Sequence, residues 1–303
     1  MRYIKSIPTF FPIFTLMVFF CFCAAACAPD YAARSPVSLV IISRVSRINA
    51  SMKANLQTIR ADGLTKGRPP GGQIGQWGDS ITHSMAYLAA SLNSDSKTQD
   101  NYSYGPIVGW MGNLKLKNPD NWGEHPYPAS NNYGNYSGWQ TTDWLADGAA
   151  IIKNVNPSWA LIMFGTNDLR MGVELSVYKD NLTNIVNTNI DAGVIPVLST
   201  IPPQTIASDN ARIPGFNAAI KEIAAAKNIP YVDLWGLYED LHPNNWAALS
   251  DGDVHPNYGT GGGADIGNDE TLKNNGYLLR SVLTAEMAEK LKTIVWDDRE
   301  PDI

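Results

Sequence analysis

Short apolar runs alternate with longer amphipathic segments from residue 73 to residue 292, and this alternation restricts the fold more than any other feature of the chain. The apolar runs predict strands at residues 74–77, 159–164, 194–199 and 229–234, with a weak one at 133–136. The amphipathic segments predict helices at residues 81–92, 141–152, 175–192, 214–226 and 277–292. Strands that alternate with helices form parallel βαβ units, so we expect an α/β fold with helices on both faces of a parallel sheet.

Four polar patches follow one another in the sequence: Gly78-Asp79-Ser80, Ser137-Gly138-Trp139, Gly165-Thr166-Asn167-Asp168 and Asp251-Gly252-Asp253-Val254-His255-Pro256. The first three each come just after an expected strand, and the fourth lies in the long loop after the last strand. Parallel sheets bind ligands at the carboxyl ends of their strands, so we expect the patches to meet at one edge. Together they supply a nucleophile, polar donors and a general base, as acyl transfer requires.

Composition and charge narrow the class of partner. The chain has 303 residues, of which 44% are hydrophobic and 17% charged, as expected for one globular domain with an appended N-terminus. The formal net charge is -6, and Lys and Arg form no cluster. A nucleic acid partner, or a membrane surface held by charge, is therefore not expected. A small-molecule or polysaccharide ester is the expected substrate.

Residues 1–27 have the pattern of an export signal. Arg2 and Lys5 precede an apolar stretch at residues 10–26, and small residues close it. Ala24 to Cys27 resembles a bacterial lipobox with Cys27 as the lipidated residue, although Leu is commoner than Ala at the first position. Simple cleavage after a small residue is the alternative. We expect a periplasmic, cell-surface or secreted protein that touches membrane only through this signal or a lipid anchor.

The cysteines and the following segment complete the domain plan. All three cysteines, Cys21, Cys23 and Cys27, lie in the signal, so no disulfide or thiolate metal site is expected beyond it. Residues 28–72 predict a tether and one leading helix, with helical spacing at 49–59 and a Gly/Pro run at 67–72. The main domain is then expected at residues 73–295.

In this order the four patches resemble the motifs of the SGNH (GDSL-type) hydrolases, across roughly residues 73–292. The resemblance implies a three-layer α/β/α sandwich around a flavodoxin-like five-stranded parallel sheet. It also implies a serine esterase without a cofactor. No HExxH or other metal-ligand spacing occurs, so a metal site is not expected either.

The resemblance assigns roles that compete with ordinary structural ones. Ser80 is the expected nucleophile and His255 its general base, although a serine here can also cap the helix expected from residue 81. The oxyanion hole is expected from the backbone N–H groups of Ser80 and Gly138 and the side-chain amide of Asn167. Gly138 and Asn167 are also common turn residues. Asp79 and Asp168 are assigned to loop hydrogen bonds.

The acid that orients His255 departs from the family pattern. The usual position, three residues before the histidine, holds Gly252, and Asp251 and Asp253 flank it. Asp251 is preferred because residues four apart share a face in a turn, with Asp253 as the alternative.

The other histidines are less suited to the role of base. His125 and His242 also precede proline, so the His-Pro pair alone does not select His255. His255 is preferred because acidic residues flank it and an amphipathic helix follows. His83 is expected on a helix surface.

The segment between Ser80 and Gly138 bears on the substrate. It is much longer than a minimal βαβ unit of about 30 residues requires. It contains six aromatic residues among many Asn, Gly and Pro: Tyr102, Tyr104, Trp110, Trp122, Tyr127 and Tyr133. Such rings suit sugars, but they can instead fix a long loop to the domain.

Three functions are consistent with these features. The first is an exported esterase that removes small acyl groups, above all acetyl, from a carbohydrate. The second is a lipase or thioesterase acting on longer acyl chains. The third is a non-catalytic carbohydrate-binding protein on the same scaffold, which the irregular position of the acid allows.

Overall fold

The computed structural model describes residues 34–88, 92, 95–114, 132–259 and 265–302, which belong to one compact unit beginning at Ala33. The expected signal with its cysteines lies outside the described residues, as do Trp122, His125 and Tyr127. In the part of the chain that is described, no helix combines the length and the hydropathy that a membrane span requires.

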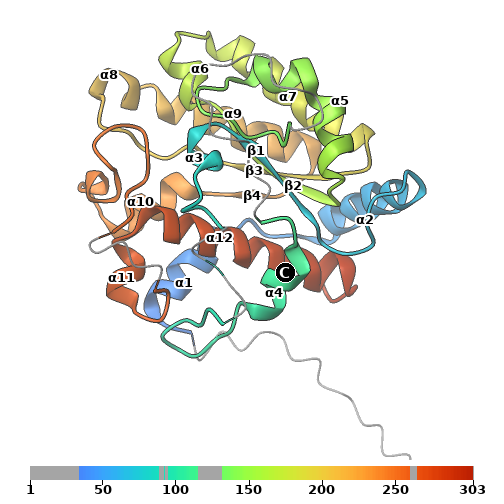
Figure 1. The fold of residues 1–303 in the computed structure, drawn as a ribbon, viewed down its shortest axis with the longest axis horizontal. Coiled ribbons are helices and arrows are strands. Elements are labelled where there is room, and N and C mark those ends of the chain that lie inside the picture. Colours follow the sequence, from blue (N-terminus) through green and yellow to red (C-terminus); the bar gives the residue numbers. More distant parts are fainter. Residues whose placement is uncertain (1–33, 89–91, 93–94, 115–131, 260–264, 303) are drawn as a thin grey trace, which may run out of the picture. The chain divides into compact units, whose positions relative to one another are not determined.

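Within the described residues, four parallel strands form the sheet. They are β1 (Ile74–Gly78), β2 (Trp159–Met163), β3 (Ile195–Ser199) and β4 (Tyr231–Val232), hydrogen-bonded in the order β1-β2-β3-β4 (Figure 1). Every residue of the first three strands is buried, as expected for a parallel sheet covered on both faces. The α/β class expected from the sequence is confirmed.

The weak strand expected at residues 133–136 is reduced to one parallel bridge, between Asn135 and Gly78. Gly134 has a positive φ of 80°, which interrupts the extended backbone. The Asn135 side chain also donates to the carbonyl oxygens of Gln76 and Tyr133. Because β2 occupies the other side of β1, this segment takes the outer position that a second strand has in a flavodoxin-like sheet.

Helices cover both faces of the sheet. Three lie on one face: α5 (Thr141–Val155), α7 (Leu175–Asp191) and α9 (Ile213–Lys227) (Figure 1). The other face carries α12 (Gly276–Leu291), packed against α1 (Pro36–Ser43), α4 (Gly105–Met111) and α10 (Leu234–Leu241). Nearly all residues of α12 are buried, because it lies between the sheet and these outer helices.

The remaining helices are α2 (Ala50–Thr65) and several short ones. The short α-helices are α3 (Ser80–His83), α6 (Thr166–Arg170), α8 (Ala207–Asn210) and α11 (Asp269–Lys273). A 3-10 turn spans Trp246–Leu249, and a π-helical turn spans Lys292–Trp296.

The structure differs from two expectations drawn from the sequence. The helix expected at residues 81–92 ends at His83, because Ser84 adopts an extended conformation and its hydroxyl accepts a hydrogen bond from the Ala86 N–H. Residues 28–72 predict one leading helix, whereas the structure has two, α1 and α2. Both belong to the domain, since side chains such as Ile41 and Leu56 are buried in its core.

A buried ion pair fixes the start of the described chain. Arg34 pairs with Glu286 of α12, and Tyr104 from the long segment before Gly138 donates to the same carboxylate. The Arg34 guanidinium also donates to the Tyr104 hydroxyl at 3.1 Å. A buried charge requires such partners. The cluster therefore joins the N-terminal residues, the long segment and α12.

Candidate active site

Ser80 lies at the carboxyl end of β1, as the first residue of α3. The side chain of Asp79, not that of Ser80, caps this helix by accepting the Ile81 N–H at 3.0 Å. The capping alternative for Ser80 is therefore wrong. Its hydroxyl is free to make a different contact.

That contact is with His255. The Nε2 atom of His255 lies 2.8 Å from Ser80 Oγ, and its Nδ1 lies 2.9 Å from Asp253 Oδ1. A carboxylate that accepts the Nδ1 proton leaves Nε2 as the acceptor for the serine hydroxyl. The three side chains thus form a hydrogen-bonded line from carboxylate to hydroxyl.

The preference for Asp251 as the partner of His255 is wrong, and the alternative Asp253 makes the contact. The prediction assumed a single helical turn, but the loop folds back on itself. The Asp251 N–H donates to the His255 carbonyl oxygen at 2.8 Å, and Gly252 has a φ of +88°. The Asp253 carboxylate also accepts the backbone N–H of His255 at 2.8 Å, so a spacing of two residues suffices.

The charge state of Asp253 follows from its contacts. Partial burial acts to raise its pKa, but hydrogen bonds from the His255 and Val254 N–H groups and the charge and ring N–H of His255 outweigh that effect. The pKa of Asp253 therefore lies below its ordinary value. The carboxyl group stays ionised and can stabilise a protonated imidazole.

The segment that carries Gly138 is hydrogen-bonded to the end of β1. The Gly78 N–H donates to the Gly134 carbonyl oxygen at 3.0 Å, and the Tyr136 N–H donates to the Gly78 carbonyl oxygen at 3.2 Å. Gly138 has a φ of +84°, which favours glycine, and open space lies where a side chain would begin. Its backbone is thus accessible beside the end of β1, two residues before Ser80.

Asn167 joins this segment from the next strand. It lies in α6, directly after β2, and its Nδ2 donates to the Trp139 carbonyl oxygen at 3.1 Å. An amide nitrogen has two hydrogens, so a second remains for another acceptor. The structure therefore brings Gly138 and Asn167 to the same sheet edge as Ser80, and their donation to an oxyanion stays a prediction.

Asp168 has a structural contact, in agreement with its assignment to loop hydrogen bonds. It is buried and accepts hydrogen bonds from the backbone N–H and the hydroxyl of Thr141, which tie the start of α6 to the start of α5. Burial raises the pKa of Asp168, against the lowering effect of these hydrogen bonds.

Arg280 is a supporting residue that sequence reasoning missed. From the second turn of α12 its guanidinium donates to the Ile81 carbonyl oxygen at 2.8 Å and to the Thr82 hydroxyl at 2.9 Å. It also lies 3.7 Å from the ring centre of Tyr87. The sequence signal that could have identified it is a lone arginine among the apolar residues of a helix. Such an arginine is expected to be buried, and a buried charge must find partners. Arg280 thereby holds the short helix that carries Ser80.

Asn257, another residue missed from the sequence, fixes the loop after His255. Its N–H donates to the Leu249 carbonyl oxygen at 2.8 Å, and its side-chain oxygen accepts the Gly276 N–H at 2.7 Å. The first residue of α12 therefore positions the base, while Arg280, one turn later, positions the nucleophile.

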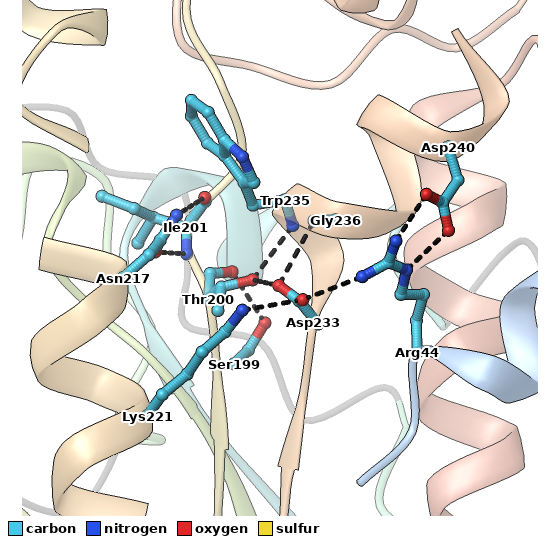
Figure 2. A network of polar contacts seen from close by, with 10 residues as sticks. All are labelled: Arg44, Ser199, Thr200, Ile201, Asn217, Lys221, Asp233, Trp235, Gly236 and Asp240. Carbon is cyan, nitrogen blue, oxygen red and sulfur yellow. Dashed lines mark hydrogen bonds and ion pairs between the residues drawn. The ribbon is translucent and has the colours of Figure 1, made fainter. Parts of the chain in front are cut away.

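A polar network lies at the carboxyl ends of β3 and β4 (Figure 2). Asp233 is its centre: it accepts from the Thr200 hydroxyl at 3.2 Å and from Lys221 Nζ at 2.8 Å. It also accepts the Gly236 N–H at the start of α10 and pairs with Arg44. Hydrogen bonds and ion pairs to these four groups therefore compensate the charge of the buried carboxylate.

The segment that follows β3 contacts the loop that carries Asp253. Six residues after Ser199, the Thr205 hydroxyl donates to the Gly252 carbonyl oxygen at 2.7 Å, and its N–H donates to the Asp253 carbonyl oxygen at 3.1 Å. The segment after β3 thus contacts the residue that orients His255.

Other candidate residues lie elsewhere. His242 Nε2 is 2.8 Å from the Lys273 carbonyl oxygen, at the end of α10. Three aromatic residues of the long segment fix it to the domain. Tyr104 is buried, Tyr102 lies under the Arg34 guanidinium, and Trp110 packs edge-on against Trp296. For these three rings, the alternative to sugar binding is the correct interpretation.

A family model matches the part of the chain that carries the site. A model of the GDSL-like lipase/acylhydrolase family matches residues 77–258, which include all of the candidate site residues. The chain is similar to the solved structure of a GDSL-like lipase from Bacteroides thetaiotaomicron, with 16% identity, a TM-score of 0.49 and coverage of 78% of this chain and 98% of that one. It is also similar to an acetylxylan esterase from Geobacillus stearothermophilus, with 18% identity, a TM-score of 0.46 and coverage of 72% and 94%. The comparison with curated proteins finds no match.

The first prediction separates the two aspartates. Asp253→Asn is expected to lower kcat for ester hydrolysis at least about a hundredfold, because the amide no longer selects the imidazole tautomer that accepts the Ser80 proton. Asp251→Asn is the matched control and is expected to stay within about twofold of the wild type. Steady-state kinetics on both purified variants make the comparison, and a larger loss in Asp251→Asn contradicts the assignment.

The second prediction concerns Asp79, which is buried beside Ser80. Desolvation raises the pKa of Asp79 to about 6, against the lowering effects of the Ile81 N–H and the Arg280 charge. An aspartate in the unfolded chain titrates near about 3.9. The folded state therefore binds the proton more tightly, and this group makes the protein less stable as pH rises from about 4 to about 6, by roughly 3 kcal/mol.

Asp79→Asn removes this titration and keeps an oxygen for the Ile81 N–H. Urea unfolding at about pH 4 and about pH 7 measures the effect. From about pH 4 to about pH 7, the unfolding free energy of the wild type is expected to fall by roughly 3 kcal/mol more than that of the variant, because only the wild type carries the Asp79 titration. Asp62→Asn, at an exposed position on α2, is the control. An identical pH dependence in the wild type and Asp79→Asn contradicts the prediction.

Proposed function

Because the chain belongs to the GDSL-like lipase/acylhydrolase family, we propose that it is an esterase that removes small acyl groups, above all acetyl, from a carbohydrate. The family and the site together make it a serine hydrolase of carboxylic esters. The observation that carries the proposal is the line from Asp253 through His255 to Ser80, with both contacts shorter than 3 Å.

The chemistry follows from this line. Ser80 Oγ attacks the ester carbonyl carbon while His255 Nε2 takes its proton, and Asp253 stabilises the resulting imidazolium. Negative charge develops on the carbonyl oxygen, where the Ser80 and Gly138 N–H groups and the Asn167 amide are the proposed donors. His255 then protonates the leaving alcohol, and a water molecule activated by the same imidazole hydrolyses the acyl-enzyme.

The preference for a small acyl group rests on the sequence around the site. The long segment between Ser80 and Gly138 is rich in Asn, Gly and Pro and contains no long apolar run. A long acyl chain needs a largely apolar pocket, which such a segment does not favour. The third function, binding without catalysis, was suggested by the irregular position of the acid. Asp253 removes that reason, since it contacts His255 directly.

Export through residues 1–27 is part of the proposal. The apolar stretch and the small residues before Cys27 support it. The mass of the mature N-terminus distinguishes a lipidated Cys27 from simple cleavage.

The third prediction tests the acyl preference. The kcat/KM of the purified enzyme is expected to fall at least about tenfold from para-nitrophenyl acetate to para-nitrophenyl octanoate, because a short acyl pocket excludes the longer chain. Ser80→Ala is expected to abolish both activities, while Ser43→Ala, an exposed serine at the end of α1, is the matched control. A faster rate on the octanoate ester supports the lipase or thioesterase alternative instead.

A further inference from the structure

Tyr258 is an exposed aromatic residue three positions after His255. Its fractional exposure is 47%, whereas the large aromatic side chains of the core, such as Tyr104 and Trp77, are fully buried. Neither the catalytic line nor the core uses the exposed part of this ring. It is therefore available to a ligand.

The backbone around Tyr258 is held on both sides. Its carbonyl oxygen accepts a hydrogen bond from Asn275 Nδ2 at 2.7 Å. Asn257, the preceding residue, is hydrogen-bonded to Leu249 and Gly276 as described above. Tyr258 is thus fixed to the same helix start that positions His255.

The ring is supported as well. It packs against Tyr277, with 5.1 Å between ring centres and 36° between ring planes. Tyr277 is 2% exposed, so its position is set by the core. An aromatic ring fixed in advance loses little conformational entropy when it binds a ligand.

Tyr258 approaches the nucleophile through space as well as along the chain. The hydroxyl of Tyr277 is hydrogen-bonded to Ser84, and the Ser84 N–H donates to the Ser80 carbonyl oxygen at 3.0 Å. His255, three residues before Tyr258, contacts the Ser80 hydroxyl. These two connections link Tyr258 to the nucleophile through Tyr277 and Ser84, and to the base along the chain.

We propose that the exposed face of Tyr258 binds the pyranose ring of the alcohol part of the ester; this inference rests on the proposed function. The leaving alcohol must lie next to His255, because His255 Nε2 gives it a proton. The acyl oxygen points instead toward the oxyanion donors. Because Tyr258 belongs to the loop that carries His255, its ring is assigned to the alcohol side.

The chemistry of the ring fits a sugar. The face of an aromatic ring carries partial negative charge, and the C–H groups on one face of a pyranose carry partial positive charge. The phenol hydroxyl at the edge can bond to sugar hydroxyls. A tyrosine therefore offers a pyranose both an apolar face and a polar edge.

The fourth prediction compares three acetyl esters: ethyl acetate, cyclohexyl acetate and the peracetylated methyl β-xylopyranoside. Tyr258→Leu is expected to lower the ratio of kcat/KM for the pyranoside to kcat/KM for ethyl acetate by about tenfold, because the ring contact is lost. Tyr258→Phe keeps the ring and is expected to keep the ratio within about threefold. Leu64→Ala, an exposed apolar position on α2, is the control that leaves the ratio unchanged.

Two kinetic outcomes overturn the inference while leaving the proposed function standing. One is an unchanged ratio in Tyr258→Leu. The other is an equal loss for cyclohexyl acetate and the pyranoside, which identifies the ring as a general apolar contact. Failure of the wild type to hydrolyse any of the three esters overturns the proposed function instead.

A binding measurement decides the inference without catalysis. Saturation-transfer NMR compares binding of methyl β-xylopyranoside to Ser80→Ala and to the double variant Ser80→Ala, Tyr258→Leu. Loss of the sugar signal in the double variant supports the inference. Equal signals from both proteins, or no signal from Ser80→Ala, overturn it.

Discussion

The contact between Ser80 Oγ and His255 Nε2 joins residues that are 175 positions apart, and much of the structure serves to keep it at 2.8 Å. Ser80 is placed by β1, a buried strand whose last residue is flanked by Met163 on one side and Asn135 on the other. His255 is placed by a loop with no regular structure of its own. A catalytic contact of this kind requires both partners to be fixed to the same rigid support.

Helix α12 is that common support. Its first residue, Gly276, donates to Asn257 and so fixes the loop of His255. One turn later, Arg280 donates to the Ile81 carbonyl oxygen and to the Thr82 hydroxyl, and so fixes the helix of Ser80. The helix is buried along nearly its whole length, so the amphipathic character expected for residues 277–292 is not found in the structure. Burial also strengthens these charge-assisted contacts, because the local dielectric is low.

The sequence predicted the fold well because strands and helices leave a periodic signal. The hydrophobic pattern predicted the four strands and the long helices α2, α5, α7, α9 and α12. The strand order predicted that the polar patches meet at one edge. The length of α3 did not follow, since the break depends on the single conformation of Ser84. The second N-terminal helix was missed because α1 is short and apolar on all sides, so its sequence resembles a strand.

The site was predictable to the level of residue type and not of loop geometry. Ser80 and His255 meet as their motifs suggested, but the choice between Asp251 and Asp253 depended on how the chain turns at Gly252. A positive φ there folds the loop back and brings Asp253 to the imidazole. Similarly, the sequence allowed either role for Tyr102, Tyr104 and Trp110, and only the contacts of the folded chain show that these rings fix the long segment to the domain. Asn257 acts through contacts with distant residues that no local pattern reveals. Arg280 stands out as a lone charge in an apolar helix, but that pattern does not name its partners.

Covalent labelling with an alkyl fluorophosphonate tests most directly the claim that His255 activates Ser80 as the nucleophile. Intact-mass measurement followed by peptide mapping is expected to find one adduct per chain, on Ser80, and none on Ser80→Ala. His255→Ala is expected to label at least about a hundredfold more slowly, because the serine hydroxyl loses its base. Absence of an adduct in the wild type, an adduct on another serine, or labelling of His255→Ala at the wild-type rate contradicts the account.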